Sequence, residues 1–155
     1  MTEVETLDHA FSAVIAQMIR TGQAPHYVEL AAVLGVDPET GREIVNDLVT
    51  SGIPAWTHPG TDYIASFPPF NNQPTQYRVS IDGEQRWFAQ CGFEALAVRW
   101  LFPGRVVRVD APCLDCGESL SIEMRDEEIV AVNPPTMVGY SRSAVGGDAA
   151  SRPFR

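Results

Sequence analysis

The sequence contains no lysine, so its 11 basic side chains are all arginines, against 20 acidic side chains. The resulting net charge of -9 argues against a nucleic-acid partner or an anionic membrane surface, because phosphate binding depends on clustered Lys and Arg. No apolar run reaches the length of about 18 residues that a membrane-spanning helix needs. The acidic N-terminus also lacks the apolar core of a signal peptide. We therefore expect a cytoplasmic protein with no membrane partner.

Only three cysteines are present, so they cannot all pair with one another within the chain. Cytoplasmic proteins keep their thiols reduced, and we therefore expect free or metal-bound cysteines. The hydrophobic content of 45% is typical of a globular protein, and 155 residues suffice for one domain or two small ones. These features direct attention to the thiols as candidate functional groups.

The first 66 residues have the pattern of a winged-helix-like unit. Apolar residues recur at helical spacing over residues 6–20, and a second, short helix is predicted over 27–34, where Gly35 ends it. Asp37 is a candidate N-cap, and the Pro38 that follows it predicts a third helix reaching about residue 51. The stretch 55–66 favours a small hairpin, which would be the wing.

The predicted unit at 1–66 is a poor match for DNA binding. The helix that would read the DNA contains Glu39, Glu43 and Asp47 against Arg42 as its one basic residue. Such a helix would repel phosphate. A structural or dimer-forming role is therefore preferred over a DNA-binding regulator.

A Pro- and Asn-rich linker is predicted at residues 67–76, followed by a β-rich domain at 77–140. Within this domain, alternating apolar residues precede Asp82-Gly83, a pair typical of a tight hairpin turn. One helix is expected from Gly92 to about residue 101, and three more strands follow it. Residues 141–155 are small and polar, which favours a disordered tail. The predicted fold class is α+β, a helical N-terminal unit followed by a small mixed or antiparallel sheet with one helix.

The stretch APCLDCGES places Cys113 and Cys116 in a CxxC motif followed by Gly117. In a knuckle of this kind, two thiolates can approach one metal ion while backbone N–H groups point at the sulfurs. A full zinc site needs more ligands, and Cys91 could be a third, with His58 or a carboxylate as a fourth. A thioredoxin-like redox motif is disfavoured, because it normally opens a helix and here β-forming residues flank the cysteines. The alternative is two small buried residues at a hairpin.

Cys91 and Glu94 lie three positions apart at the start of the predicted helix, so their side chains share a face. The positive end of the helix dipole would favour the Cys91 thiolate. Burial would raise the pKa of Glu94 and keep it a neutral acid that can deliver a proton. The alternative is an inert buried cysteine beside a helix-favouring glutamate. The aromatic residues expected to surround the pair are Trp87, Phe88, Phe93 and Trp100.

The order of these segments resembles the alkylmercury (organomercurial) lyase family. The similarity covers roughly residues 25–138 and rests on FAQCGFEAL, FPGRVVRVDAPC, GESLSIEM and VAVNPP. It implies that family's fold, in a short member without the C-terminal region that carries the second catalytic cysteine. It also implies protonolysis of a carbon–mercury bond, with no cofactor required for lysis.

The resemblance assigns a role to each candidate site residue. Cys91 would capture the mercury of an organomercurial, and Glu94 stands where the family has an aspartate that moves the proton. Cys113 matches a family cysteine thought to be structural. Together, Cys113 and Cys116 could replace the missing thiolate and form a three-sulfur metal site with Cys91.

Two functions therefore remain open. One is an organomercurial-lyase-like enzyme that uses Cys91 and Glu94. The other is a thiolate protein or repurposed metal-dependent enzyme that binds Hg, Zn or Cu without cleaving a carbon–mercury bond, since thiolates suit soft metal ions. In both, the expected partner is a small organometallic compound or a metal ion, and a homodimer is compatible with the sequence.

Overall fold

The computed structural model describes residues 3–139. The tail predicted to be disordered, at 141–155, lies outside the described residues. Within them, no helix has both the length and the apolar character needed to cross a membrane.

Three helices form the N-terminal part of the chain: α1 (Glu3–Thr21), α2 (Tyr27–Leu34) and α3 (Pro38–Thr50). The predicted end of α2 is confirmed, because Gly35 adopts the left-handed conformation at its C-terminus. The predicted N-cap of α3 is also confirmed, since the Asp37 carboxylate accepts a hydrogen bond from the Thr40 N–H at 3.0 Å. Local capping thus sets the helix boundaries.

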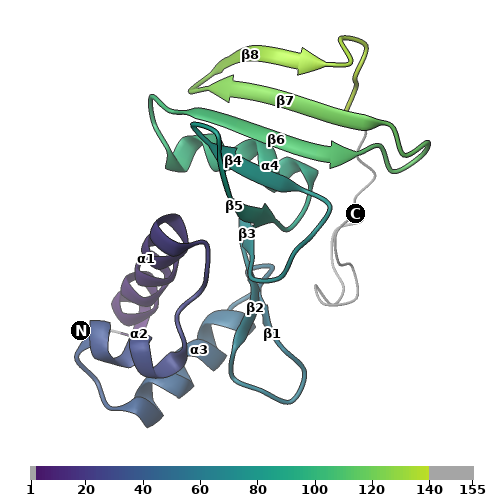
Figure 1. Cartoon of the computed structure of the whole chain (residues 1–155). Helices are drawn as coiled ribbons and strands as arrows, with labels where there is room; N and C mark the ends of the chain where they lie inside the picture. The colour runs from purple at the N-terminus through teal and green to yellow at the C-terminus, as the bar shows by residue number, and fades with distance from the viewer. Residues whose placement is uncertain (1–2, 140–155) are drawn as a thin grey trace.

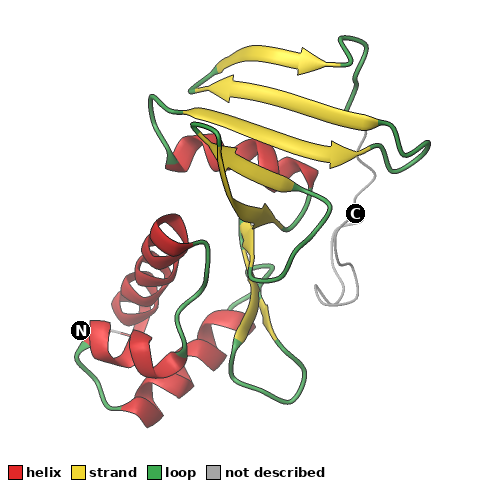
Figure 2. Ribbon diagram, viewed as in Figure 1, coloured by secondary structure: helices red, strands yellow, loops and turns green. Residues whose placement is uncertain are grey.

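Eight strands form one sheet in the order β1-β2-β3-β5-β4-β6-β7-β8, and every neighbouring pair is antiparallel. The α+β fold class is therefore confirmed, with an antiparallel sheet. In Figure 2 the three N-terminal helices gather beside the narrow end of this sheet, away from its long strands. The strands are β1 (Trp56–Thr57), β2 (Ile64–Phe67), β3 (Phe70–Asn71), β4 (Arg78–Ile81), β5 (Glu84–Ala89), β6 (Val106–Pro112), β7 (Ser119–Arg125) and β8 (Glu128–Asn133).

The segment predicted as a linker, 67–76, contributes three of its residues to the sheet, namely Phe67, Phe70 and Asn71. The end of β2 and all of β3 lie in it, and Phe67 and Phe70 are fully buried. Phe67 pairs with Phe70 across a turn made by Pro68 and Pro69. The ladder therefore continues from the β1–β2 hairpin into the long strands without a break (Figure 1).

The helix expected from Gly92 to about residue 101 is present as α4 (Gly92–Ala97), continued by the 3₁₀ helix η1 (Val98–Leu101). Both lie behind the strands β4 and β6 in Figure 1. Ala95 and Val98 point into the core, together with Val79 of β4 and Val107 of β6. This packing fixes the position of α4 against the sheet.

Candidate functional site

The β4–β5 hairpin positions Cys91 at the start of α4. Asp82 and Gly83 both have positive φ, 48° and 88°, as the predicted tight turn requires. At the other end of the hairpin, the Ala89 N–H donates to the Tyr77 carbonyl at 3.0 Å. Cys91 follows two residues later as the N-cap residue of α4. Its backbone is thus held by the sheet on one side and the helix on the other.

The Cys91 thiol and the Glu94 carboxyl are joined by a side-chain hydrogen bond. Burial is the largest influence on Glu94 and raises its pKa, although the hydrogen bond from Cys91 opposes the increase. The expectation that Glu94 has a raised pKa is therefore confirmed. An acid of this kind keeps its proton to higher pH than an exposed glutamate and can give it up to a reacting group.

The expected preference for the Cys91 thiolate at the start of the helix is outweighed by burial. Burial raises the pKa of Cys91, and the adjacent Glu94 carboxylate raises it further. The N–H groups of Glu94 and Phe93 point toward the sulfur but offset only part of this increase. Because α4 has only six residues, its dipole lowers the pKa of Cys91 by less than desolvation raises it. The Cys91 thiol therefore keeps its proton to a higher pH than an exposed cysteine does.

Tyr77 lies against this pair and was not identified as a site residue from the sequence. A Cβ on Gly92 would meet the Tyr77 ring at 3.5 Å and its hydroxyl oxygen at 3.7 Å. Burial is the main cause that raises the pKa of Tyr77, and Cys91 adds to it electrostatically. The alternation of apolar residues that begins just before β4 predicts that Tyr77 faces inward, but nothing local indicates that it borders Cys91.

The aromatic residues expected to bury the pair divide into two groups. Trp87 is buried, with its ring 5.2 Å from that of Phe102, and Phe88 is half-buried. Phe93 and Trp100 are instead 66% and 65% exposed, so they do not enclose the pair as expected. They border a shallow, mainly apolar depression of about 390 Å³ on the outer side of α4, lined by Phe93, Glu94, Leu96, Ala97, Arg99 and Trp100.

Cys113 and Cys116 occupy the turn between β6 and β7, which projects from one end of the sheet in Figure 1. The backbone N–H groups of Cys116 and then of Asp115 lower the pKa of Cys113, and the Cys116 thiol lowers it further. The predicted knuckle, with N–H groups directed at a sulfur, is therefore present. The alternative of two buried residues at a hairpin is wrong, because Cys113 is only half-buried and Cys116 is exposed.

The structure does not bring all of the predicted metal ligands together. Between residues 3 and 139, no group of three or more Cys, His, Asp or Glu side chains is placed to hold a metal ion. Cys91 at the start of α4 and the pair on the β6–β7 turn are thus two separate thiol sites. That they share one metal ion remains a prediction that would require the chain to rearrange.

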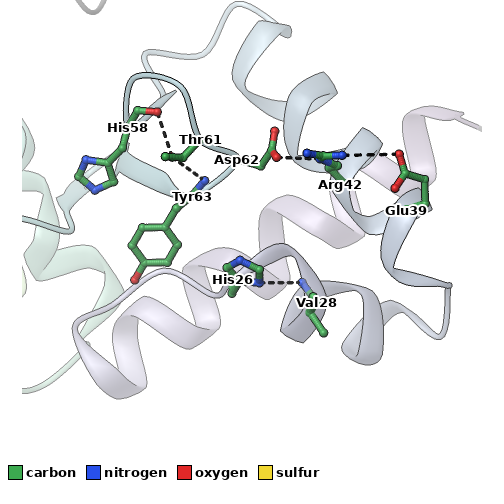
Figure 3. Close-up of polar contacts among 8 residues, drawn as sticks. All are labelled: His26, Val28, Glu39, Arg42, His58, Thr61, Asp62 and Tyr63. Carbon is green, nitrogen blue, oxygen red and sulfur yellow. Dashed lines mark hydrogen bonds and ion pairs between the residues drawn. The ribbon is translucent and has the colours of Figure 1, made fainter.

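His58, the predicted fourth ligand, lies in the β1–β2 loop. Its ring stacks on that of Tyr63 with centroids 5.7 Å apart, and its carbonyl accepts the Thr61 hydroxyl at 3.0 Å (Figure 3). His26, on the other side of Tyr63, caps α2 together with Glu29. Both histidines therefore have structural contacts of their own.

Comparisons with known proteins agree with the resemblance seen in the sequence. The family model described as alkylmercury lyase matches residues 70–152. Alkylmercury lyases of Bacillus cereus and Clostridium butyricum are each 34% identical to the chain over 68 residues, which is 42% of this chain and 29% of each relative. The chain therefore matches less than a third of the length of these relatives.

A solved structure has the same fold. The mercury-bound form of MerB2 superposes with a TM-score of 0.63 at 19% identity, covering 84% of this chain and 61% of that one. The superposition extends beyond the segment that the family model matches, because 84% of the chain includes part of the N-terminal helices as well.

Proposed function

Because the chain belongs to the alkylmercury lyase family, we propose that it captures an organomercury compound on Cys91 and releases the carbon group by proton transfer from Glu94. The observation that supports this most directly is the hydrogen bond between the two side chains, within the segment that the family model matches. Mercury is a soft, thiophilic ion, so a thiol is the expected capturing group. No resident cofactor is required.

The hydrogen bond supplies a route for the proton. As the mercury of R–Hg–X bonds to the Cys91 sulfur, X⁻ leaves and the thiol proton passes to the Glu94 carboxylate. Glu94 then protonates the carbon, the carbon–mercury bond breaks, and R–H departs while Hg²⁺ stays on the Cys91 thiolate. The raised pKa of Glu94 suits a group that must both accept and return one proton.

The apolar depression beside Glu94 supports binding of the organic group. It is bordered by Phe93, Leu96 and Trp100, so a hydrocarbon substituent would lose water there next to the acid that protonates it. A second thiolate on mercury would weaken the carbon–mercury bond further. Since residues 3–139 place no other thiol beside Cys91 and Glu94, a small thiol from the cytoplasm is the proposed second ligand.

The test is release of benzene from phenylmercury acetate in the presence of a small monothiol. We expect turnover by the unmodified chain and none by Cys91→Ser. The serine hydroxyl is similar in size to the thiol but lacks the soft sulfur that mercury binds. Circular dichroism of both chains controls for folding. Equal benzene release by the two chains would refute the proposal.

A second function, binding of a soft metal without bond cleavage, is favoured by the exposed Cys113–Cys116 pair. If this were the function, the purified protein would hold about one mercury, copper or zinc ion per chain but would release no benzene. Elemental analysis beside the turnover assay separates the two functions.

A further inference from the structure

The β6–β7 turn presents two thiols that the proposed protonolysis does not use. The Cys113 N–H donates to the Glu118 carbonyl at 2.7 Å, and the Gly117 N–H donates to the Cys113 carbonyl at 2.9 Å. Gly117 has a φ of +76°, a conformation that glycine adopts without strain. The turn is therefore shaped by its own backbone, and the two thiols are already neighbours before any ligand arrives.

The surroundings of the sulfur atoms resemble those of a metal-binding knuckle. The N–H groups of Asp115 and Cys116 point at the Cys113 sulfur, and the Cys116 thiol contacts the same sulfur. Donors aimed at a sulfur stabilise it as a thiolate ligand. Both thiols also remain accessible, since Cys116 is exposed and Cys113 half-buried.

The number of ligands selects among metal ions. Within the described part of the chain no third Cys, His, Asp or Glu joins this pair in a metal-binding group, although Asp115 and Glu118 are close in sequence. Structural zinc is almost always held by four ligands in a tetrahedron, so two thiolates alone suit it poorly. Mercuric and cuprous ions are soft and accept two thiolates in a nearly linear arrangement.

We infer that Cys113 and Cys116 form a two-thiolate site for one soft d¹⁰ cation, separate from Cys91. Mercuric ion is the cation that the proposed reaction would release, and only this choice of ion rests on the proposed function. Binding is an exchange without oxidation or reduction: one Hg²⁺ forms two bonds to sulfur, and the two thiols release two protons to solvent.

The test uses the full chain carrying Cys91→Ser, which leaves the pair as its only thiols. It is titrated with mercuric ion, its free thiols are counted, and its mass is measured under native conditions. We expect one mercury per chain, loss of both free thiols, and retention of the ion against about a 100-fold excess of a monothiol, because linked ligands gain about 10²–10⁴-fold over separate ones. Adding Cys113→Ser or Cys116→Ser should abolish this retention.

The inference would be overturned by one free thiol left at saturation, by a mercury that bridges two chains, or by equal retention in the single-thiol variants. Zinc retained as tightly as mercury would also overturn it, since that would require further ligands. Because mercuric ion is supplied directly, the outcome does not depend on bond cleavage. A chain that binds the ion here but releases no benzene would keep this site and refute only the proposed function.

Discussion

The Cys91 thiol is hydrogen-bonded to the Glu94 carboxyl across the first turn of α4. Both groups are partly withdrawn from water, and burial is the largest cause that raises the pKa of each. Desolvation therefore favours the neutral form of both. Once Glu94 has ionised, the one remaining proton lies on Cys91 and can pass to the Glu94 carboxylate over this hydrogen bond, which is what a capture step followed by protonolysis needs.

Replacement of Glu94 by Gln should lower benzene release by about 10²–10⁴-fold, the usual contribution of a positioned acid. Glu94→Asp keeps the acid but shortens the side chain by one methylene, so its activity should lie between those of the Gln variant and the unmodified chain. Initial rates at saturating phenylmercury acetate measure both. Mercury capture by Cys91 should survive in the Gln variant, and an unchanged turnover there would show that another group supplies the proton.

The stability of the protein should depend on pH through Glu94. Since burial raises the pKa of Glu94 in the folded state, folding favours its neutral form. This stabilisation is fully present below the pKa of the unfolded chain and is lost as pH rises through the higher pKa of the folded state. Relative to the unmodified chain, Glu94→Gln should therefore gain stability between acidic and neutral pH. Urea unfolding at a series of pH values measures this difference, and Glu127→Gln on the exposed β7–β8 turn controls for loss of a surface carboxylate.

Loss of the Asn72 side chain should destabilise the junction between helices and sheet. Its amide oxygen accepts from the Ala24 N–H at 2.7 Å, and its amide nitrogen donates to the Ile64 carbonyl at 2.7 Å. Asn72→Ala removes both of these hydrogen bonds from buried backbone groups, which should cost roughly 2–4 kcal/mol of unfolding free energy. Denaturant titration measures the loss. Gln73→Ala, at the exposed neighbouring position, is the control and should change stability little.

Gly41 allows α2 and α3 to approach closely, and a side chain there should push them apart. A Cβ at this position would lie 2.6 Å from the Ala31 Cβ and 2.8 Å from the Tyr27 carbonyl oxygen. We expect Gly41→Ala to lower the unfolding free energy by about 1–3 kcal/mol. Gly92→Ala is the matched control, because its new Cβ meets the Tyr77 ring at 3.5 Å, an ordinary contact. Equal unfolding midpoints for the two variants would contradict the predicted clash.

The parts of the fold that could be predicted from the sequence are those governed by local interactions. The boundaries of α2 follow from helical spacing and Gly35, and the β4–β5 turn follows from Asp82-Gly83. The 67–76 segment was expected to be a linker because Pro and Asn disfavour strands. Its role in the sheet depends on Phe67 and Phe70, whose burial in the shared core outweighs local propensity.

The features of the candidate site that could be predicted from the sequence are also the local ones. The pairing of Cys91 with Glu94, and the knuckle at Cys113 and Cys116, are contacts within one turn and could be predicted from spacing. The contact of Tyr77 with Gly92, and the separation of the two thiol sites, depend on how β4, α4 and the β6–β7 turn are placed in space. Spacing along the chain contains no information about those distances.

The placement of two tryptophans provides optical reporters without any label. Trp100 is 65% exposed and borders the same depression as Glu94, whereas Trp87 is 4% exposed and its indole N–H donates to the Met18 carbonyl at 2.8 Å. A mercury compound that settles beside α4 would quench the fluorescence of the first residue through the heavy-atom effect. Trp87 would keep its emission until α1 separates from β5. Quenching of Trp100 would therefore report ligand binding, and a change in Trp87 emission would report unfolding of the core.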